Sequence, residues 1–392
     1  MLIPVDNCSS CMACLNVCTR KAIRVIQNVN GFYRPEIDEQ HCIKCGMCEQ
    51  SCPSIHLKEN PFEKIEEKVF AAYNLNEEIR KKSSSGGIFS AIAEYFVDRG
   101  GVAVGVAEGP NLNLKFYIAE NKYDLEKLRG SKYFQANPGF IYKEVKEKLD
   151  KGVQVLFSGT PCQIAALYSV LRKKYENLLT VDLICAGVPS QKVYEKYIKE
   201  KYHRENGIRT IFRDKASGWK GYSMTDVIEY PSRRISQKRM SERAWKNIFF
   251  RTFMARLCKN DSCNPRDCKY GRLPRIADIT LGDFWGIENF HPEMDDNKGT
   301  SVVIVNTEHG KKFLEKIKDS LRLCESKMEY VIQGVPAVNG PFPPNENRDN
   351  FFEKRNDYSL KKLLKLYDPK PNLIVRGVKK IRKFIHCLTT GV

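Results

Sequence analysis

The sequence lacks features that would place it in a membrane or outside the cell. No apolar run reaches the roughly 18 residues that a bilayer-spanning helix needs, and no apolar signal segment follows Met1. Acidic residues are also scarce: 47 Asp and Glu stand against 65 Lys and Arg, a formal net charge of +18. We therefore expect a cytoplasmic protein with acidic or anionic partners. Because the usual nucleic-acid-binding motifs are missing, nucleic acid is not expected among them.

Cysteine, by contrast, is abundant, with 15 in 392 residues. Disulfide-dense proteins are typically small and secreted, whereas a chain of this length can bury a hydrophobic core without disulfide bonds. The Cys are therefore expected to be thiolates that bind metal. Eight Cys stand in two copies of the spacing C-x2-C-x2-C-x3-C, which are "CSSCMACLNVC" and "CIKCGMCEQSC". A zinc site usually needs two pairs separated by a longer loop, so this spacing favours iron–sulfur clusters.

In ferredoxins with two 4Fe-4S clusters the fourth Cys of such a run ligates the other cluster. The spacing therefore predicts that one cluster is held by the first three Cys of the first run and the last Cys of the second run. The other cluster is held by the first three Cys of the second run and the last Cys of the first run. The two sets are Cys8, Cys11, Cys14 and Cys52, and Cys42, Cys45, Cys48 and Cys18. Between the runs, an alternating segment turns at Asn30-Gly31, which predicts a β-hairpin.

The predicted fold class is α+β: a bacterial-type two-cluster ferredoxin module over residues 1–57, followed by a larger mixed α/β domain. Residues 58–68 are polar, are broken by Pro61 and are typical of a linker. Beyond them, strand-like and helix-like segments alternate, and the strand, helix, strand order over 153–185 predicts a parallel crossover unit. The domain is expected to span 69–352, and 353–392 to form a basic C-terminal tail.

Two turns before predicted helices suit an anionic cofactor. The first contains Ser84, Ser85, Gly86 and Gly87, and the second contains Thr160. Free backbone N–H groups and the helix dipole at such turns bind phosphate, although ordinary helix caps use the same residue types. A third segment, "LRGSKYFQANPG", adds Ser131 and Lys132. Lys132 is a candidate to lie over a flavin or diphosphate, and a solvated surface charge is the alternative.

The remaining Cys point to a third cluster. They are Cys162 at a helix start, Cys185 at a strand end, and Cys258, Cys263 and Cys268 in one short segment. Any one of them alone would usually be buried and inert, but five near Gly and Pro turns predict a 4Fe-4S site. The expected ligands are Cys162, Cys185, Cys263 and Cys268, with Cys258 in reserve. Cys324 and Cys387 are expected to be structural or free.

Five segments together carry a family resemblance: "SSSGGIFSAIAEYFVDRGGVAVGVA", "LRGSKYFQA", "VLFSGTPCQIAALYSVL", "TVDLICAGVPS" and "ADITLGDFWGIE". The combination resembles the family of coenzyme F-420 hydrogenase/dehydrogenase beta subunits. The resemblance implies FAD, a further 4Fe-4S cluster in the catalytic domain, and switching between two-electron and one-electron transfer. Asp283, at the tip of a predicted strand, is a candidate to hold a ring or ribose group, and a packed strand end is the alternative. Members of this family tend to have His where this chain has Ala186, which removes a proton donor or polar flavin contact.

The sequence therefore predicts an iron–sulfur flavoprotein oxidoreductase. FAD is expected to exchange a hydride with a reduced deazaflavin or another small-molecule donor or substrate, while the clusters pass electrons to or from a ferredoxin or similar acidic partner. No catalytic residue is assigned. Two alternatives stay open, namely a ferredoxin-dependent reductase in surface polysaccharide synthesis and a non-catalytic electron-transfer subunit.

Two basic segments are candidate contact surfaces. The stretch from Ser232 to Lys259 is expected to form an amphipathic helix with a solvated basic face, or a dock for an acidic partner. The basic tail is expected to make weak peripheral contact with an anionic membrane or to form a cytosolic interaction helix.

Overall fold

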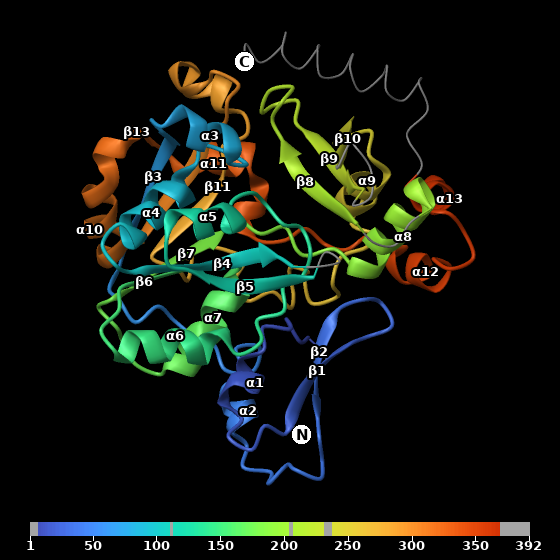
Figure 1. Ribbon diagram of the computed structural model, residues 1–392, viewed down its shortest axis with the longest axis horizontal. Helices are drawn as coiled ribbons and strands as arrows, with labels where there is room; N and C mark the ends of the chain where they lie inside the picture. Colours follow the sequence, from blue (N-terminus) through green and yellow to red (C-terminus); the bar gives the residue numbers. More distant parts are fainter. Residues whose placement is uncertain (1–6, 110–112, 204–206, 231–236, 369–392) are drawn as a thin grey trace.

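The computed structural model describes residues 7–109, 113–203, 207–230 and 237–368, and it has two parts (Figure 1). The smaller part is the N-terminal module, with α1 (Ala13–Val17), β1 (Ile23–Gln27), β2 (Tyr33–Ile37) and α2 (Met47–Gln50). As predicted, β1 and β2 form an antiparallel hairpin, in which Ile23 lies opposite Ile37. The Asn28 side chain accepts hydrogen bonds from the N–H groups of Asn30 and Phe32 at 3.1 and 2.9 Å, and this closes the turn.

The larger part is built on an eight-stranded sheet of order β13-β3-β12-β11-β7-β6-β4-β5. Its strands are β3 (Lys64–Asn74), β4 (Val102–Glu108), β5 (Leu114–Ala119), β6 (Val155–Gly159), β7 (Leu178–Leu183), β11 (Ile279–Asp283), β12 (Ser301–Thr307) and β13 (Leu321–Ser326). The central strands β4, β6, β7 and β11 are parallel, and the outer pairings are antiparallel. The predicted crossover from β6 to β7 is confirmed.

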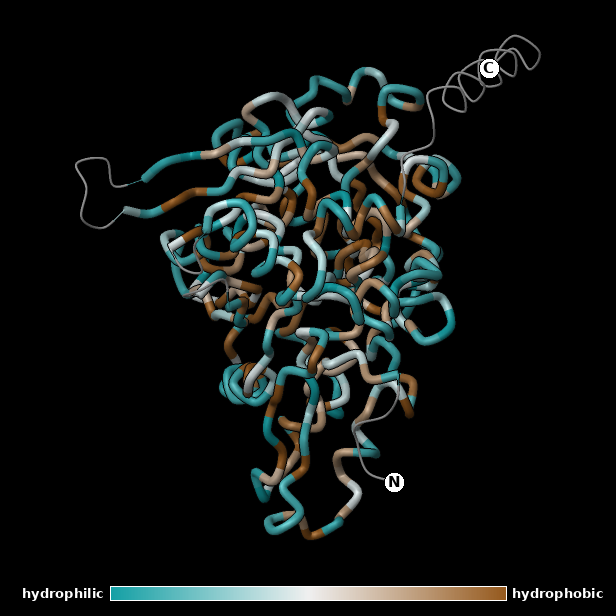
Figure 2. Tube along the Cα trace, turned by 90° about the vertical axis from the view of Figure 1, so that its right-hand side faces the viewer, coloured by the Kyte–Doolittle hydropathy of each residue, from teal (hydrophilic) through white to brown (hydrophobic). Residues whose placement is uncertain are grey.

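Helices cover both faces of this sheet because its central strands are apolar on both sides. In β6, Leu156 contributes to the core under α4 (Ile88–Val97), α5 (Lys122–Leu128) and α10 (Glu308–Ile317). Val155 and Phe157 contribute to the core under α6 (Ile141–Asp150) and α7 (Pro161–Leu171). Such doubly buried strands are typical of parallel sheets. Figure 2 shows the hydrophobic segments gathered inside and the narrow module at one end.

A three-stranded sheet, β8 (Ile208–Asp214), β9 (Ser223–Glu229) and β10 (Gln237–Arg243), packs beside the main domain with α8 (Gln191–Tyr202) and α9 (Ile248–Met254). We expected a basic amphipathic helix from Ser232 to Lys259, and for the described part of that stretch this prediction is wrong. Gln237–Arg243 instead pairs antiparallel with β9, so ladder hydrogen bonds to a partner strand outweigh the local helical pattern. Within the described residues of this stretch, the second half contains the one helix, α9.

Two stretches outside the predicted domain core are ordered. Strand β3 begins at Lys64, and Asn60 Nδ2 donates to the Ile276 carbonyl at 3.0 Å, so the stretch 58–68 packs against the domain. Helices α12 (Arg348–Glu353) and α13 (Leu360–Tyr367) bury Phe351 and Leu363 in a core shared with α8 and α9. Cys387 and the basic end of the tail, 369–392, lie outside the described residues. Among the described helices, none has the length and apolarity to traverse a bilayer.

The module is held against the domain on two sides. On one side, Cys11 and Ala13 share a core with α6 and α7, and Ser169 Oγ donates to the Ser51 carbonyl at 2.5 Å. On the other side, the hairpin turn reaches α8 and α12, where Ser190 Oγ donates to the Asn30 carbonyl. These contacts join segments more than a hundred residues apart, so the position of the module on the domain is fixed.

Arg275 ties a distant loop to the end of β7. Its side chain is fully buried, and it donates to Asp182 Oδ2 at 3.0 Å, to the Leu183 carbonyl at 2.7 Å and to the Gly271 carbonyl at 2.8 Å. Burial raises the pKa of Asp182, and the Arg275 guanidinium counteracts that shift. The pair therefore anchors the segment that follows Cys268 close to Cys185.

Replacing Arg275 tests this anchor. Arg275→Met leaves the buried Asp182 carboxylate unpaired, so we expect the free energy of unfolding to fall by about 3–5 kcal/mol at pH 8. The loss should shrink toward pH 5, because an unpaired buried carboxyl takes up a proton more readily than the same group in the unfolded chain. Denaturant unfolding at both pH values measures this, and the exposed Lys269→Met should change stability by no more than about 0.5 kcal/mol. Equal losses in the two variants would contradict the anchor.

Candidate metal and cofactor sites

Four thiols assigned to one cluster line a single cavity in the module. Cys8, Cys11, Cys14 and Cys52 surround it together with Met12 and Pro53. The chain can wrap this space because Ser10 and Met12 take left-handed backbone conformations, with φ of 57° and 59°. Burial and the neighbouring thiols raise the pKa of Cys11 to about 12. Thiolates so close together and so desolvated need a compensating cation, which is what iron supplies.

The second set is the more exposed of the two in the module. Burial, and to a lesser extent the nearby thiols of Cys42 and Cys45, raise the pKa of Cys48. Cys18 packs on the same small core that contains Cys48, and Cys45 is exposed. The second set is therefore closer to solvent than the first.

The third set is assembled from three separate segments. Burial raises the pKa of Cys162, Cys185 and Cys263, and nearby thiols of the same set raise it further. Cys162 and Cys263 are each affected by Cys185 and Cys268. Cys185 is affected by Cys268. Two glycines leave room for the sulfur atoms. A Cβ at Gly187 would lie 2.9 Å from Cys263 Cβ, and one at Gly271 would lie 2.9 Å from Cys268 Sγ. The structure thus brings together Cys162, Cys185, Cys263 and Cys268.

Cys258, the reserve ligand, has a different setting. It is fully buried in the aromatic core beside α8 and α9, where burial raises its pKa to about 12. The groups around its thiol are the Ser190 N–H, Lys259 and Arg348. These surroundings favour a packed, protonated thiol over a cluster ligand.

Two tyrosines lie between the first and third sets. The Tyr142 hydroxyl donates to the Cys11 carbonyl at 2.9 Å, and both Cys11 and Cys162 influence its pKa, which burial raises well above the ordinary value. The Tyr270 hydroxyl donates to the Pro53 carbonyl at 3.1 Å and is near Cys11, Cys52 and Cys162. The pKa of Cys162 also responds to Cys11. The first and third sets are therefore neighbours across the interface between module and domain.

The predicted cofactor turn reaches the edge of the sheet where the parallel strands end. Gly86 makes this possible, because a Cβ there would lie 2.4 Å from the Ala72 carbonyl oxygen. Its N–H donates to Ser301 Oγ at 3.0 Å, and Ser301 pairs with Asp283 at the end of β11. Ligands of open α/β sheets bind at this edge. It is also the edge from which Thr160 and Cys185 follow their strands.

Of the predicted cofactor residues, the serines are brought together. Ser84 Oγ accepts a hydrogen bond from the Ser131 N–H at 2.7 Å. Thr160 is instead part of the start of α7, where its N–H donates to Gln163 Oε1 at 2.8 Å and its Oγ1 lies 3.2 Å from Cys162 Sγ. The structure therefore places Thr160 beside the third thiol set.

Lys132 is half-buried rather than fully solvated. Its ammonium donates to the carbonyls of Lys127, Leu128 and Arg129 at the end of α5, at 2.8–3.0 Å. Burial lowers its pKa to about 7, against the opposing effect of Glu108. Burial in turn raises the pKa of Glu108, at the end of β4, to about 7. Its role at a flavin stays a prediction.

Asp283 is held by basic and aromatic residues that the sequence did not reveal. Arg213 donates to both carboxylate oxygens at 2.7 and 3.0 Å, and Trp219 Nε1 donates at 3.1 Å. Two further cations lie at the turn: Lys215 donates to the Ser85 carbonyl at 2.9 Å and to the Arg80 carbonyl at 2.6 Å, and Arg80 is fully buried. No local pattern marks these residues among 65 basic ones, because they come together only through the fold.

Family comparisons agree with this arrangement. Residues 69–140 match the model of the N-terminal part of the coenzyme F420 hydrogenase/dehydrogenase beta subunit, and residues 152–330 match the model of its C-terminal part. The chain belongs to this family. Residues 7–55 match a 4Fe-4S dicluster domain, so the predicted ferredoxin module and the resemblance are both confirmed. The protein is an iron–sulfur oxidoreductase of the family of F420 hydrogenase/dehydrogenase beta subunits.

Three individual proteins show the similarity. One of the subunits of the F420H2 dehydrogenase of Methanosarcina mazei is 24% identical over 335 residues, which cover 83% of this chain and 86% of that protein. An uncharacterized protein of Methanocaldococcus jannaschii is 29% identical over 204 residues, or 42% of this chain and 53% of that protein. A chain in the F420-reducing NiFe hydrogenase complex of Methanosarcina barkeri is 17% identical, with a TM-score of 0.42, and the alignment covers 79% of this chain and 94% of that chain.

Paired substitutions in the module test how the ligands are shared. If Cys11 and Cys52 ligate one cluster, Cys11→Ser combined with Cys52→Ser removes about four iron atoms per chain. Cys11→Ser combined with Cys18→Ser removes one ligand from each cluster, so about eight iron atoms per chain are lost. Iron analysis of anaerobically purified variants measures the difference. Equal iron loss in the two double variants would contradict the shared arrangement.

Proposed function

We propose that this chain is a flavoprotein with three 4Fe-4S clusters that connects hydride chemistry to single-electron transfer. Bound FAD would exchange a hydride with a reduced deazaflavin or another diffusible donor. The clusters would then exchange electrons with a ferredoxin-like acidic protein. The observation that carries the proposal is the position of Cys162: it neighbours Cys11 on one side and begins α7 at the carboxyl edge of the sheet on the other.

The residues at this edge fit an anionic dinucleotide. The N-cap of α4 is Gly87, which offers no side-chain cap, and the first turn of α4 holds no acidic residue. Its backbone N–H groups and the helix dipole are therefore suited to a phosphate, and Lys215 adds positive charge beside Ser85, whereas the buried Arg80 guanidinium is paired with Asp296. When bound, FAD would supply the exchange between a hydride and single electrons.

Several side chains would position such a cofactor without reacting themselves. Arg213 fixes both oxygens of Asp283, so this carboxylate presents a constant geometry at the tip of β11. Trp219 stacks on Trp285 with ring centroids 4.4 Å apart and forms an apolar wall next to the carboxylate. An apolar wall with one oriented polar group is typical of cofactor sites.

The cysteines of the third set would hold a cluster that passes electrons from this edge toward the module. Cys162 and Cys185 come from the two strands next to one another in the sheet, β6 and β7, so their placement follows from the sheet itself. The buried rings of Tyr142 and Tyr270 fill the space between this set and the first set and exclude water from it. A dry, packed connection keeps electrons from being lost to solvent oxidants.

Charge supports an acidic protein partner. The chain carries +18, and β10 is an exposed basic edge that includes Lys238 and Arg239, followed by exposed Trp245. Complementary charge speeds the encounter of redox proteins. The large complement of metal-binding thiolates also supports a cytoplasmic location, because that compartment keeps thiols reduced.

Cofactor analysis of anaerobically purified protein tests the proposal. We expect about twelve iron atoms, as much sulfide and one FAD per chain. Cys162→Ser should lose about four iron atoms, retain FAD and stop electron transfer from a reduced deazaflavin to ferredoxin. Cys258→Ser is the matched control and should keep its iron, its flavin and its activity.

Three results would overturn parts of the proposal. About eight iron atoms without flavin, even after incubation with FAD, would leave a non-catalytic electron-transfer subunit. Full electron transfer in Cys162→Ser would show that the third thiol set is not on the path. Activity with an organic substrate and reduced ferredoxin, but with no deazaflavin or nicotinamide donor, would instead favour the reductase alternative.

A further inference from the structure

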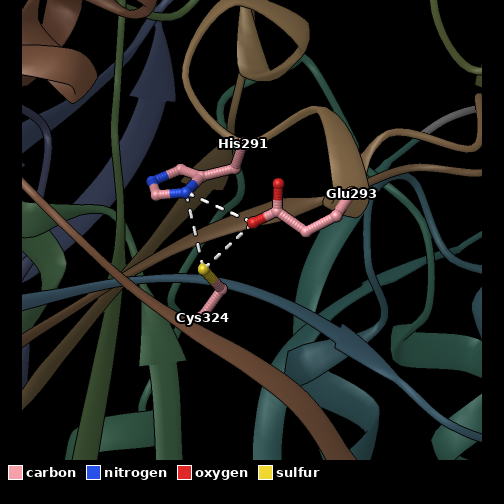
Figure 3. Close-up of side chains that lie close together, drawn as sticks. All are labelled: His291, Glu293 and Cys324. Atoms are coloured by element: carbon pink, nitrogen blue, oxygen red, sulfur yellow. Dashed lines mark hydrogen bonds and ion pairs between the residues drawn. The ribbon is translucent and has the colours of Figure 1, made fainter.

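Three side chains of different chemistry converge at the edge of the main sheet, apart from the thiol sets described above. His291 and Glu293 lie in the connection between β11 and β12, at the 3-10 helix η3 (Pro292–Met294), and Cys324 lies in the edge strand β13. Figure 3 shows His291 Nδ1, a Glu293 carboxylate oxygen and Cys324 Sγ turned toward one point. The separations are 3.4 Å for S to N, 3.5 Å for S to O and 3.6 Å for N to O.

This arrangement differs from a nucleophile, base and acid triad. In a triad the nucleophile and the carboxylate bind opposite nitrogens of the imidazole, so that a proton passes through the ring. Here both Cys324 and Glu293 face Nδ1, which has either one proton or one lone pair. Hydrogen bonds can satisfy the three groups, because the Glu293 carboxylate oxygen accepts from both the thiol and a protonated Nδ1, and a cation at their centre would replace these bonds with metal bonds.

The triangle of donor atoms has the dimensions of a zinc site. Tetrahedral zinc with bonds of about 2.3 Å to sulfur and 2.0–2.1 Å to nitrogen and oxygen places S and N, and S and O, about 3.5 Å apart, and N and O about 3.3 Å apart. The observed separations agree with these to within a few tenths of an ångström. One thiolate, one imidazole and one carboxylate favour zinc over magnesium or calcium, which prefer oxygen ligands alone.

Residues around the three donors orient the imidazole for this role. His291 Nε2 lies 2.9 Å from Ser326 Oγ, and when Nε2 donates in this hydrogen bond the Nδ1 lone pair is available to a metal. The ring is also held edge-on between Phe284 and Tyr330, with centroid separations of 6.2 and 6.0 Å. The Glu293 side chain is 54% exposed, so a fourth position is open to water.

We propose that His291, Glu293 and Cys324 bind one Zn²⁺ ion, with water as the fourth ligand. Binding releases the Cys324 thiol proton to solvent and forms the S–Zn bond. The ion joins β13 to the connection between β11 and β12. Farther along that connection, Asp296 pairs with Arg80 at 2.7 Å, and the Lys298 carbonyl accepts from Lys215. Zinc therefore stabilises the loop that borders the candidate cofactor turn.

Zinc binding by the iron-loaded protein tests the site. Anaerobic protein with its full iron complement is treated with a chelator, dialysed against Zn²⁺ and analysed for zinc and iron. We expect one zinc per chain, unchanged iron, and a zinc absorption-edge spectrum with one sulfur at about 2.3 Å and nitrogen or oxygen at about 2.0–2.1 Å. Cys324→Ser and His291→Ala should each weaken zinc binding by at least about tenfold with unchanged iron.

A neighbouring substitution provides the control. Glu325 follows Cys324 on the same strand but is exposed and points to the opposite face, so Glu325→Gln should bind zinc as the unaltered protein does. Three results would overturn the proposal: no zinc retained after dialysis, zinc retained equally in Cys324→Ser, or a spectrum with several sulfur ligands, which would place zinc at the iron-binding cysteines. The zinc spectrum of the unaltered protein distinguishes one sulfur ligand from several, so the proposal is tested even if a variant fails to fold.

Discussion

Thiol groups gathered in a water-poor interior are unfavourable as thiolates unless a cation balances their charge, and this constraint organises the molecule. Burial raises the pKa of seven of the twelve predicted ligands, most strongly at Cys14 and Cys162. The fold brings the thiols together in two ways. In the module, closely spaced Cys wrap locally around each site. In the main domain, strand ends and a distant loop bring Cys162, Cys185 and the Cys263 segment together.

The contacts between the module and the domain fix where the thiol sets lie relative to one another. The hydroxyl of Tyr142 reaches the Cys11 carbonyl, and the hairpin turn is bound to α8 and α12. Because these contacts come from far-apart parts of the chain, the first and third thiol sets keep a constant separation. The carboxyl edge of the sheet bears both the third set and the candidate cofactor turn, so the two lie at one place in the fold.

Local patterns in the sequence predicted what is local in the structure. The C-x2-C-x2-C runs, the hairpin and the β6–α7–β7 unit all depend on residues close together in the chain. Gln237–Arg243 was expected to be helical because the pairing partner, β9, was not recognised. The contacts of Asp283 with Arg213, of Ser85 with Lys215 and of His291 with Cys324 join segments of different elements. Neither spacing nor composition encodes such contacts, so only the fold reveals them.

The central claim is that the third thiol set binds a 4Fe-4S cluster next to the module. Quantitative electron paramagnetic resonance of the fully reduced protein tests it most directly, because each reduced cluster contributes one unpaired spin and neighbouring clusters couple magnetically. The account predicts about three spins per chain, and about two in Cys162→Ser, with coupling to the first cluster lost. About two spins in the unaltered protein, with a spectrum identical to that of Cys162→Ser, would contradict it.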